Sequence, residues 1–326
     1  KENCFISEPV RHSIVLHLKE FKNMKLIGKE HGVSWSTVLR VLQSLSSYVK
    51  PTFHHLPSVL LMDEFNATSR IKGKMALVYA DGISGAIQDI LPFRTADQLI
   101  AYFQKFPLEV RKQVKFVCID MNASYDKVAQ AVFPSAQIVT DRFHIIQHIN
   151  RAFNQVRIQM MKSLKGHILS QAKDKRKLKK YWKLLLKKPS SIDYTELRQY
   201  PLFRGKWLTE SEVLDYLLSI DPRLRETYQV YYELMDAYEK KDTDTFFDVI
   251  QNLSKSLDMS FKNSLRYLRN KQKKGVTNAF EQSYSNGKLE GKNNVIKVIK
   301  RQAFGFRCFS NLKLRILLQQ GLIEVR

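Results

Sequence analysis

The spacing of apolar residues changes twice along this chain, and these changes restrict the fold more than any other feature. Residues 57–145 contain short apolar runs rich in β-branched residues, such as VLLMDEFN, MALVYADG and KFVCID, which are typical of strands. The regions before and after them show helical spacing instead. The sequence therefore predicts an α/β region between two helical regions.

The order of the strand-like runs predicts the type of sheet. Three runs come first, with no helical pattern between them. TADQLIAYFQKF and SYDKVAQAVF then show helical spacing and alternate with the last two runs, KFVCID and AQIVTD. Because parallel strands need a long crossover and antiparallel strands need only a turn, we expect a mixed sheet that begins antiparallel and finishes parallel.

The first 50 residues predict a helix-turn-helix domain. RHSIVLHLKEF and MKLIGKEHG show helical spacing, and the second segment closes on Gly32. Ser34 is a suitable N-cap for the next helix, WSTVLRVLQSL. In such units the second helix enters the major groove, and the residues this places near DNA are Trp35, Ser36, Thr37 and Arg40. A three-helix packing domain without DNA contacts is the alternative.

The charge of the chain indicates a polyanionic partner. Lys and Arg number 54 against 31 Asp and Glu, which gives a formal net charge of +23. No apolar stretch approaches the roughly 18 to 20 residues of a membrane-spanning helix, and no signal-peptide pattern opens the chain. Cys4, Cys118 and Cys308 are far apart, so we expect no structural disulfide and a cytoplasmic location. Double-stranded DNA is a better partner than a membrane.

Residues 146–280 predict an all-α region. Within it, KDKRKLKKYWKLLLKK places Leu178, Tyr181, Trp182 and Leu185 on one side of a helix and surrounds them with lysines. Either this charged face is simply solvated or it contacts phosphate, and the pattern does not distinguish the two.

Three strand-like runs end near an aspartate: Asp63 in VLLMDEF, Asp120 in KFVCID and Asp141 in AQIVTD. Carboxylates that converge from separate strands can hold divalent cations for phosphodiester cleavage. An acid after a strand is also common for solubility alone. Asp63 gives the sharpest signal because it interrupts an apolar run, where an unpaired charge would be costly.

The segment SNGKLEGKNNVIKVIKRQAFG, residues 285–305, predicts a helix that carries a third acid, Glu290. At 100° per residue, the polar residues on the face of Glu290 are Asn293, Asn294, Lys297, Lys300 and Arg301. The apolar residues expected on the opposite, buried face are Val295, Val298, Ile299 and Ala303. Cations beside an acid are consistent with bound DNA phosphate, whereas an ordinary amphipathic helix is the alternative.

Four strings resemble the ISL3 family of bacterial insertion-sequence transposases: DEFN at 63–66, CIDMN at 118–122, DRFH at 141–144 and SNGKLEGKNNVIKVIKRQAFGFR at 285–307. The resemblance implies an α/β ribonuclease-H-like mixed sheet with a catalytic triad of Asp63, Asp120 and Glu290. Two Mg²⁺ or Mn²⁺ ions would bind these acids. Arg307, at the end of the last string, joins the expected DNA-binding residues.

The resemblance also divides the chain. It implies a helix-turn-helix domain at residues 1–50, the first part of the catalytic domain at 57–145, an all-α insertion at 146–280 and the remainder of the catalytic domain at 281–326. Asp141 and His144 resemble an accessory D-x-x-H signature, and capping of the following helix is the alternative role for Asp141. Relatives usually carry a cysteine-rich zinc module ahead of the helix-turn-helix, where this sequence has Cys4 alone, so a full set of end-recognition contacts is in doubt.

The implied activity is cleavage at transposon ends and transfer of the freed 3′-hydroxyl into target DNA. We expect a homodimer or larger assembly on DNA, because both ends must be held together, and a bacterial, nucleoid-associated protein. Two alternatives remain: a helix-turn-helix regulator with an inactive nuclease-like domain, and a nuclease that cleaves without joining.

Overall fold

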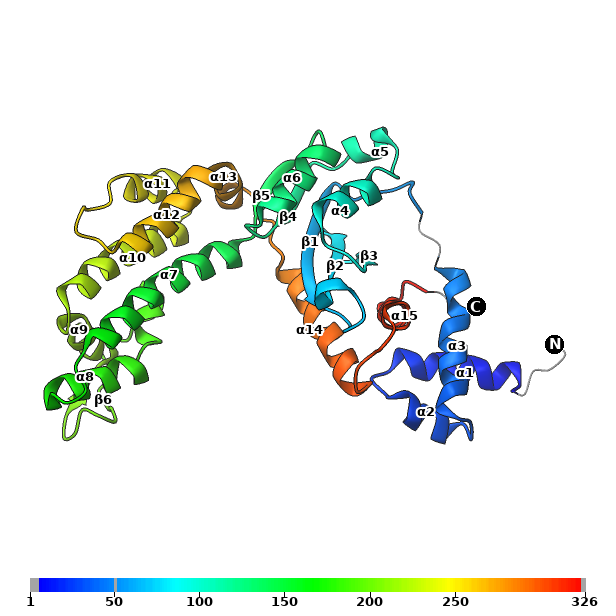
Figure 1. Ribbon diagram of the computed structural model, residues 1–326, viewed down its shortest axis with the longest axis horizontal. Helices are drawn as coiled ribbons and strands as arrows, with labels where there is room; N and C mark the ends of the chain where they lie inside the picture. The colour runs from blue at the N-terminus through cyan, green and yellow to red at the C-terminus, as the bar shows by residue number, and fades with distance from the viewer. Residues whose placement is uncertain (1–5, 50–51, 324–326) are drawn as a thin grey trace. The chain divides into compact units, whose positions relative to one another are not determined.

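The computed structural model describes residues 6–49 and 52–323, and the chain forms two compact units (Figure 1). The first unit comprises Lys1–Asp141 and Tyr284–Arg326, and the second comprises Arg142–Ser283. The chain therefore leaves the first unit directly after its last strand and returns to it just before the helix that carries Glu290. Cys4 lies outside the described residues.

The first unit contains a five-stranded sheet with helices. Its α-helices and 3₁₀ helices are α1 (Glu8–Lys19), α2 (Met24–Glu30), α3 (Trp35–Ser44), η1 (Leu45–Tyr48), η2 (Lys72–Lys74), α4 (Ala96–Phe103), α5 (Leu108–Lys112), α6 (Ala123–Val132), α14 (Gly287–Gln302) and α15 (Phe309–Gln319). Its strands are β1 (Val59–Asn66), β2 (Met75–Asp81), β3 (Ile87–Leu91), β4 (Phe116–Ile119) and β5 (Gln137–Thr140).

The strand order is β3-β2-β1-β4-β5. β1, β2 and β3 pair antiparallel, whereas β4 pairs parallel with both β1 and β5. The prediction of a mixed sheet with an antiparallel start and a parallel finish is confirmed. β1 is central and takes part in both kinds of pairing, so its residues are constrained from both sides.

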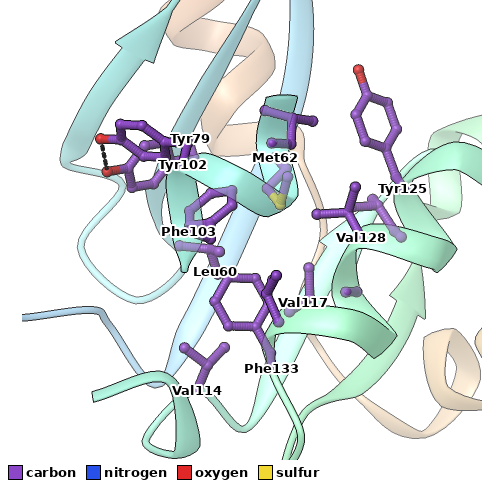
Figure 2. Close-up of a cluster of buried hydrophobic side chains, with 14 of the residues drawn as sticks. Leu60, Met62, Tyr79, Tyr102, Phe103, Val114, Val117, Tyr125, Val128 and Phe133 are labelled. Carbon is purple, nitrogen blue, oxygen red and sulfur yellow. Dashed lines mark hydrogen bonds between the residues drawn. The ribbon is translucent and has the colours of Figure 1, made fainter. Parts of the chain in front are cut away.

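One face of the sheet is covered by α4 and α6 through an aromatic and aliphatic core (Figure 2). Leu60 and Met62 of β1 pack in this cluster with Phe103 of α4 and Val128 of α6, and all four are at most 2% exposed. Burial of such side chains supplies most of the stabilisation of a sheet face. Since side chains alternate along a strand, Asp63 must point to the opposite face.

The N-terminal helices form as the sequence predicts. Ser34 caps α3 by accepting a hydrogen bond from the backbone N–H of Thr37, and Gly32 has a positive φ of 63° in the turn before it. Gly28 permits the tight turn, because a Cβ there would lie 2.6 Å from the carbonyl oxygen of Val33.

Helix α15 packs against α1 and α3. The buried Arg315 of α15 donates to the carbonyl oxygens of Glu20 and Lys22, at 2.9 and 2.7 Å. Burial lowers the pKa of Arg315 to about 10. Lys313 of the same helix forms an ion pair with Asp89 of β3 at 2.5 Å. The C-terminal helix thus contacts both the N-terminal helices and the antiparallel edge of the sheet.

The second unit is almost wholly helical. Its helices are α7 (Arg142–Ser163), α8 (Leu169–Lys180), η3 (Leu184–Leu186), η4 (Pro189–Ser191), α9 (Glu210–Ser219), α10 (Pro222–Lys240), α11 (Thr243–Gln251), α12 (Met259–Lys271) and α13 (Lys273–Glu281). Two details differ from prediction. A short hairpin forms between β6 (Arg198–Gln199) and β7 (Trp207–Leu208). The lysine-rich helix ends at Lys180, so Tyr181 and Trp182 lie beyond it.

None of the helices in the described ranges is long and apolar enough to cross a membrane.

Replacement of Gly28 by Ala is expected to destabilise the first unit by about 1 to 3 kcal/mol, because the added methyl group would overlap a backbone oxygen that cannot rotate away. Gly291→Ala in α14 is the control, since no atom lies within 4 Å of a Cβ there and alanine favours a helix. Thermal and urea unfolding measure both variants. Equal stability of the two would show that the close approach at Gly28 is not required.

Candidate active site

The parallel half of the sheet brings three aspartates to one level. Leu61 of β1 pairs with Cys118 of β4, and Ile119 of β4 pairs with Thr140 of β5. Continuing each register by one or two residues places Asp63, Asp120 and Asp141 side by side. Adjacent strands are about 4.8 Å apart, and parallel partners point to the same face. The register therefore sets the three residues at one level, at the carboxyl end of the parallel pairing.

Helix α14 lies along β1 on this face (Figure 1). Asn286, at its N-terminus, donates from Nδ2 to the carbonyl oxygen of Met62 at 3.1 Å. Two turns later Asn293 donates from Nδ2 to Oδ2 of Asp63 at 2.7 Å. Two turns later again, Lys300 donates to the carbonyl oxygen of Asn66. This seven-residue repeat fixes the helix along the strand that carries Asp63.

The buried face of α14 differs from the predicted one. Its buried residues are Leu289, Asn293, Ile296 and Ile299, whereas Val298 is 39% exposed. Of the residues predicted for the buried face, Ile299 is buried, Val295 and Ala303 are half-buried, and the prediction was wrong for Val298. The helix is rotated so that Asn293, assigned to DNA on sequence grounds, is only 5% exposed and contacts Asp63. The polar amide is retained on the inner face because a carboxylate accepts its hydrogen bond.

Glu290 lies on the outer flank of α14, exposed to solvent. On the helical wheel it shares one stripe with three further exposed polar residues, Asn294, Lys297 and Arg301. Glu290 is also three residues before Asn293, so their Cβ atoms are roughly 5 to 6 Å apart. Through Asn293, Glu290 is thus placed next to Asp63, although its side chain points to solvent.

Within the described ranges, no three carboxylate, histidine or cysteine side chains converge into a group that could hold a metal ion. The structure therefore aligns Asp63 with Asp120 by strand register and sets Glu290 on the neighbouring helix, without bringing the three together as a closed ligand set. Asp63 and Asp120 are both half-buried.

The chemistry of the surrounding groups fits a hard divalent cation. Oδ1 of Asn286 and Oδ1 of Asn293 are buried, and neither has a hydrogen-bond partner among the residues that the structure describes. Their orientation is fixed by chemistry, since each amide nitrogen must face an oxygen acceptor. Buried oxygens without donors are rare in proteins, and carboxylate and amide oxygens are ligands that Mg²⁺ and Mn²⁺ accept.

Asp141 is 3% exposed and accepts a hydrogen bond from the backbone N–H of Asn286 at 3.1 Å. It directly precedes α7, whose first turn contains His144. Asp141 is thereby linked to α14 across 145 positions of sequence. His144 belongs to the second unit.

Glu64 is a neighbour of Asp63 with a different environment. It points to the α4–α6 face, where Arg94 forms an ion pair with it at 2.8 Å and Tyr125 donates a hydrogen bond. Burial, together with the Glu64 carboxylate, raises the pKa of Tyr125. Tyr125 therefore stays protonated at neutral pH.

The predicted DNA-contacting residues Trp35, Ser36, Thr37 and Arg40 lie in the first turns of α3, the second helix of the helix-turn-helix. Trp35 is 53% exposed, while the hydroxyl groups of Ser36 and Thr37 bond to the N-cap Ser34. Arg40 donates to Thr37 at 3.0 Å. Trp35 also lines an apolar pocket of about 530 Å³ together with residues 303–308, which include the predicted DNA-binding Arg307. Asn286 was not singled out from the sequence, because its role depends on the hydrogen bonds that α14 makes across the fold.

The family follows from comparison of the sequence with known proteins. The family model for ISL3-type DDE transposases, described as "Transposase", matches residues 60–316. This range contains the whole sheet from the second residue of β1, together with all of α14 and most of α15. The chain belongs to the ISL3 family of DDE transposases.

Two curated relatives are similar to this chain. The "Transposase for insertion sequence element IS1001" of Bordetella parapertussis is 25% identical over 295 residues, which cover 89% of this chain and 68% of that protein. A Lactococcus lactis subsp. lactis protein named "ATP-dependent protease" is 42% identical over 114 residues, 35% of this chain and 36% of that protein. The second match thus spans little more than a third of either protein.

Replacement of Asn293 by Ala is expected to lower the free energy of unfolding by about 1 to 3 kcal/mol, because the half-buried Asp63 carboxylate loses a short hydrogen bond. Asn294→Ala is the matched control, since Asn294 is exposed and contacts only Lys297 among the bonds described for it. Urea unfolding of the two variants compares them directly. A loss no greater for Asn293→Ala than for Asn294→Ala would contradict the role of Asn293 as an anchor.

Proposed function

We propose that this protein is a transposase that cleaves DNA at transposon ends and transfers the freed 3′-hydroxyl into target DNA, on a ribonuclease-H-like fold. The alignment of Asp63 with Asp120 on adjacent parallel strands, beside the helix that carries Glu290, is the observation that carries the proposal. The strand order and directions, with three antiparallel strands followed by two parallel ones, support the fold assignment. Membership of the DDE transposase family supports the reaction type.

Asp63, Asp120 and Glu290 would hold two Mg²⁺ or Mn²⁺ ions. Such ions supply a nucleophilic oxygen at neutral pH and stabilise the negative charge that develops on the attacked phosphate. In the first step a water oxygen attacks the phosphorus, the bond from phosphorus to O3′ breaks and a 3′-hydroxyl is released. In the second step that hydroxyl attacks a target phosphate and displaces the O3′ of the target strand. No protein nucleophile is required.

The protein's own residues would position the reacting groups. Asn293 and the backbone N–H of Glu64 both donate to Asp63, at 2.7 Å in each case, and hold its carboxylate in one orientation. Glu290 would have to turn from solvent toward Asp63 to share an ion with it, and α14 is already fixed along β1. Asp141 would fix the N-terminus of α14 through Asn286, and His144 remains an accessory candidate for organising DNA.

DNA would follow the exposed stripe of α14. Asn294, Lys297 and Arg301 lie on the same side as Glu290 and are exposed, so phosphate contacts there would place a strand beside the acids. Trp35, Ser36, Thr37 and Arg40 would contact the transposon end, with Arg307 contributing from the loop before α15. Lys300 differs from these residues because it donates a hydrogen bond to the side chain of Asn66. Its partial burial lowers its pKa. A homodimer or larger assembly would hold both ends.

The regulator alternative makes a different prediction, since a helix-turn-helix protein with an inactive nuclease-like domain would bind DNA without cutting it. The site does not favour that alternative, because Asp63 and Asp120 both accept specific hydrogen bonds and Glu290 is present on the adjacent helix.

The proposed reaction predicts that Asp63→Asn, Asp120→Asn and Glu290→Gln each reduce strand cleavage by at least about 100-fold, because each removes a charged metal ligand. Binding of the same DNA should be retained. The assay uses labelled DNA with the element's ends, with Mg²⁺, with Mn²⁺ or with EDTA, and scores nicked and joined products.

Asp97→Asn serves as the control, since this acid is exposed in the first turn of α4. Cleavage that persists in EDTA or in all three active-site variants would contradict the proposal. Wild-type binding without cutting under either metal would favour the regulator, and cutting without joined products would favour a simple nuclease.

A further inference from the structure

The second unit contains a pocket of about 560 Å³ that the proposed reaction does not use. Helix α8 contributes Lys173, Arg176 and Lys177 to its wall, and the loop of the β6–β7 hairpin contributes Arg204 and Lys206. A volume of this size falls in the range of small-ligand sites. Five cations therefore surround one concave surface.

None of these five cations forms an ion pair within 4.0 Å in the part of the chain that the structure describes. Other cations of the same unit do pair with carboxylates, for example Lys188 with Glu239, Arg223 with Asp221 and Lys240 with Asp236. The five cations of the pocket therefore remain available to an anionic partner.

The acids near the pocket are already engaged. Glu212, which lines it, closes the capping box of α9 by accepting from the backbone N–H of Thr209. Asp174 accepts a hydrogen bond from the hydroxyl of Tyr216 at 2.7 Å. Both carboxylates have structural roles and keep their negative charges, so they offset part of the positive charge but leave an excess of cations around the pocket.

Lys177 forms the floor of the pocket and is only 9% exposed. Its ammonium group lies 3.7 Å from the ring centroid of Tyr216 and 4.5 Å from that of Phe203. Burial lowers its pKa, the negative charge of Asp174 opposes this, and the positive charges of Lys206 and Lys173 act in the same direction as burial. Cation–π contacts hold the group in place, but a buried ammonium with cationic neighbours is best stabilised by an anion.

The hairpin loop is held in an unusual conformation at the rim. Leu202 has a positive φ of 76°, which is costly for a residue with a branched side chain, and Gly205 has a φ of 75°. This conformation places Arg204 and Lys206 on the pocket wall opposite α8. Trp207, which follows directly, is 61% exposed and offers an aromatic surface of the kind on which bases stack.

We propose that this pocket binds a backbone phosphate of DNA and so gives the helical unit its own contact with the substrate of the proposed transposase. The inference rests on the proposed function in one respect, because that function identifies DNA as the source of the phosphate. The chemistry it requires is that of a phosphate group, which a free nucleotide also carries, so the test separates the two sources.

The pocket variant combines Lys173→Ala, Arg204→Ala and Lys206→Ala, all at exposed positions. The control variant combines Lys188→Ala, Arg223→Ala and Lys240→Ala. It removes the same number of positive charges, three, but from cations of the same unit that form ion pairs. Fluorescence anisotropy of a labelled 20-base-pair duplex measures affinity across a salt series, in EDTA so that no cleavage occurs. Circular dichroism confirms that both variants are folded.

We expect the pocket variant to lose at least about tenfold in affinity at low salt, with a slope of log K against log salt that is smaller by about 1 than that of wild type, since one phosphate contact is lost. The control variant should keep a slope close to wild type. Equal slopes for the two variants would overturn the proposal, because the charges would then act only through net charge.

Pyrophosphate and ATP provide the second arm, monitored as thermal shifts of wild type and of the pocket variant. Stabilisation of wild type alone by these ligands, with unchanged DNA binding in the pocket variant, would assign the pocket to a free nucleotide and overturn the DNA proposal. The readout is independent of the reaction. If the protein cleaves and joins DNA but the two variants have equal salt slopes, the phosphate site in the pocket is refuted and the proposed reaction is not. If the slopes differ as expected but the protein does not cleave DNA, the proposed reaction is refuted and the phosphate site is not.

Discussion

The parallel register of β1, β4 and β5 is the constraint on which the candidate site depends. A parallel pair fixes both the level and the face of each residue, so the hydrogen bonds that join Leu61 to Cys118 also determine where Asp63 and Asp120 lie. Three carboxylates at one level repel one another, and only a rigid backbone can hold them there. β1 supplies this rigidity because it is paired on both sides and because Leu60 and Met62 are fully buried beneath it.

Helix α14 completes the arrangement through polar contacts rather than through apolar packing alone. Leucine and isoleucine side chains hold a helix against a sheet but define its position along the strand only loosely. Hydrogen bonds from Asn286, Asn293 and Lys300 to successive positions of β1 define it closely, since a shift of one residue would break all three. The chain can therefore insert the whole second unit between β5 and α14 and still return Glu290 to the same place.

Much of this architecture is predictable from the sequence, and the remainder is not, for identifiable reasons. The strands and their directions follow from apolar runs and the helices between them, and Ser34 and Gly32 give the turn before α3 because capping and positive φ are local properties. The orientation of α14 was predicted incorrectly because periodicity assumes that polar residues face outward. Asn293 is buried because it donates a hydrogen bond to Asp63, and that partner lies 230 positions away, where periodicity cannot detect it. Asn286 could not be recognised for the same reason, since its partners are also distant in the sequence. Helix α8 ends earlier than its lysine and leucine pattern predicts, which moves Tyr181 and Trp182 out of the helix and leaves Lys177 buried.

The contrast between Asp63 and Glu64 shows how adjacent acids of one strand acquire different chemistry. Alternation sends them to opposite faces. Glu64 is paired with the guanidinium of Arg94, and a neutralised carboxylate of this kind has little charge left to offer a cation. Asp63 accepts hydrogen bonds from two neutral donors, the N–H of Glu64 and the amide of Asn293. Neutral donors orient a carboxylate and stabilise its ionised form without cancelling its charge. An amide at position 293 therefore holds Asp63 in place without itself cancelling the negative charge, which a lysine at that position would do.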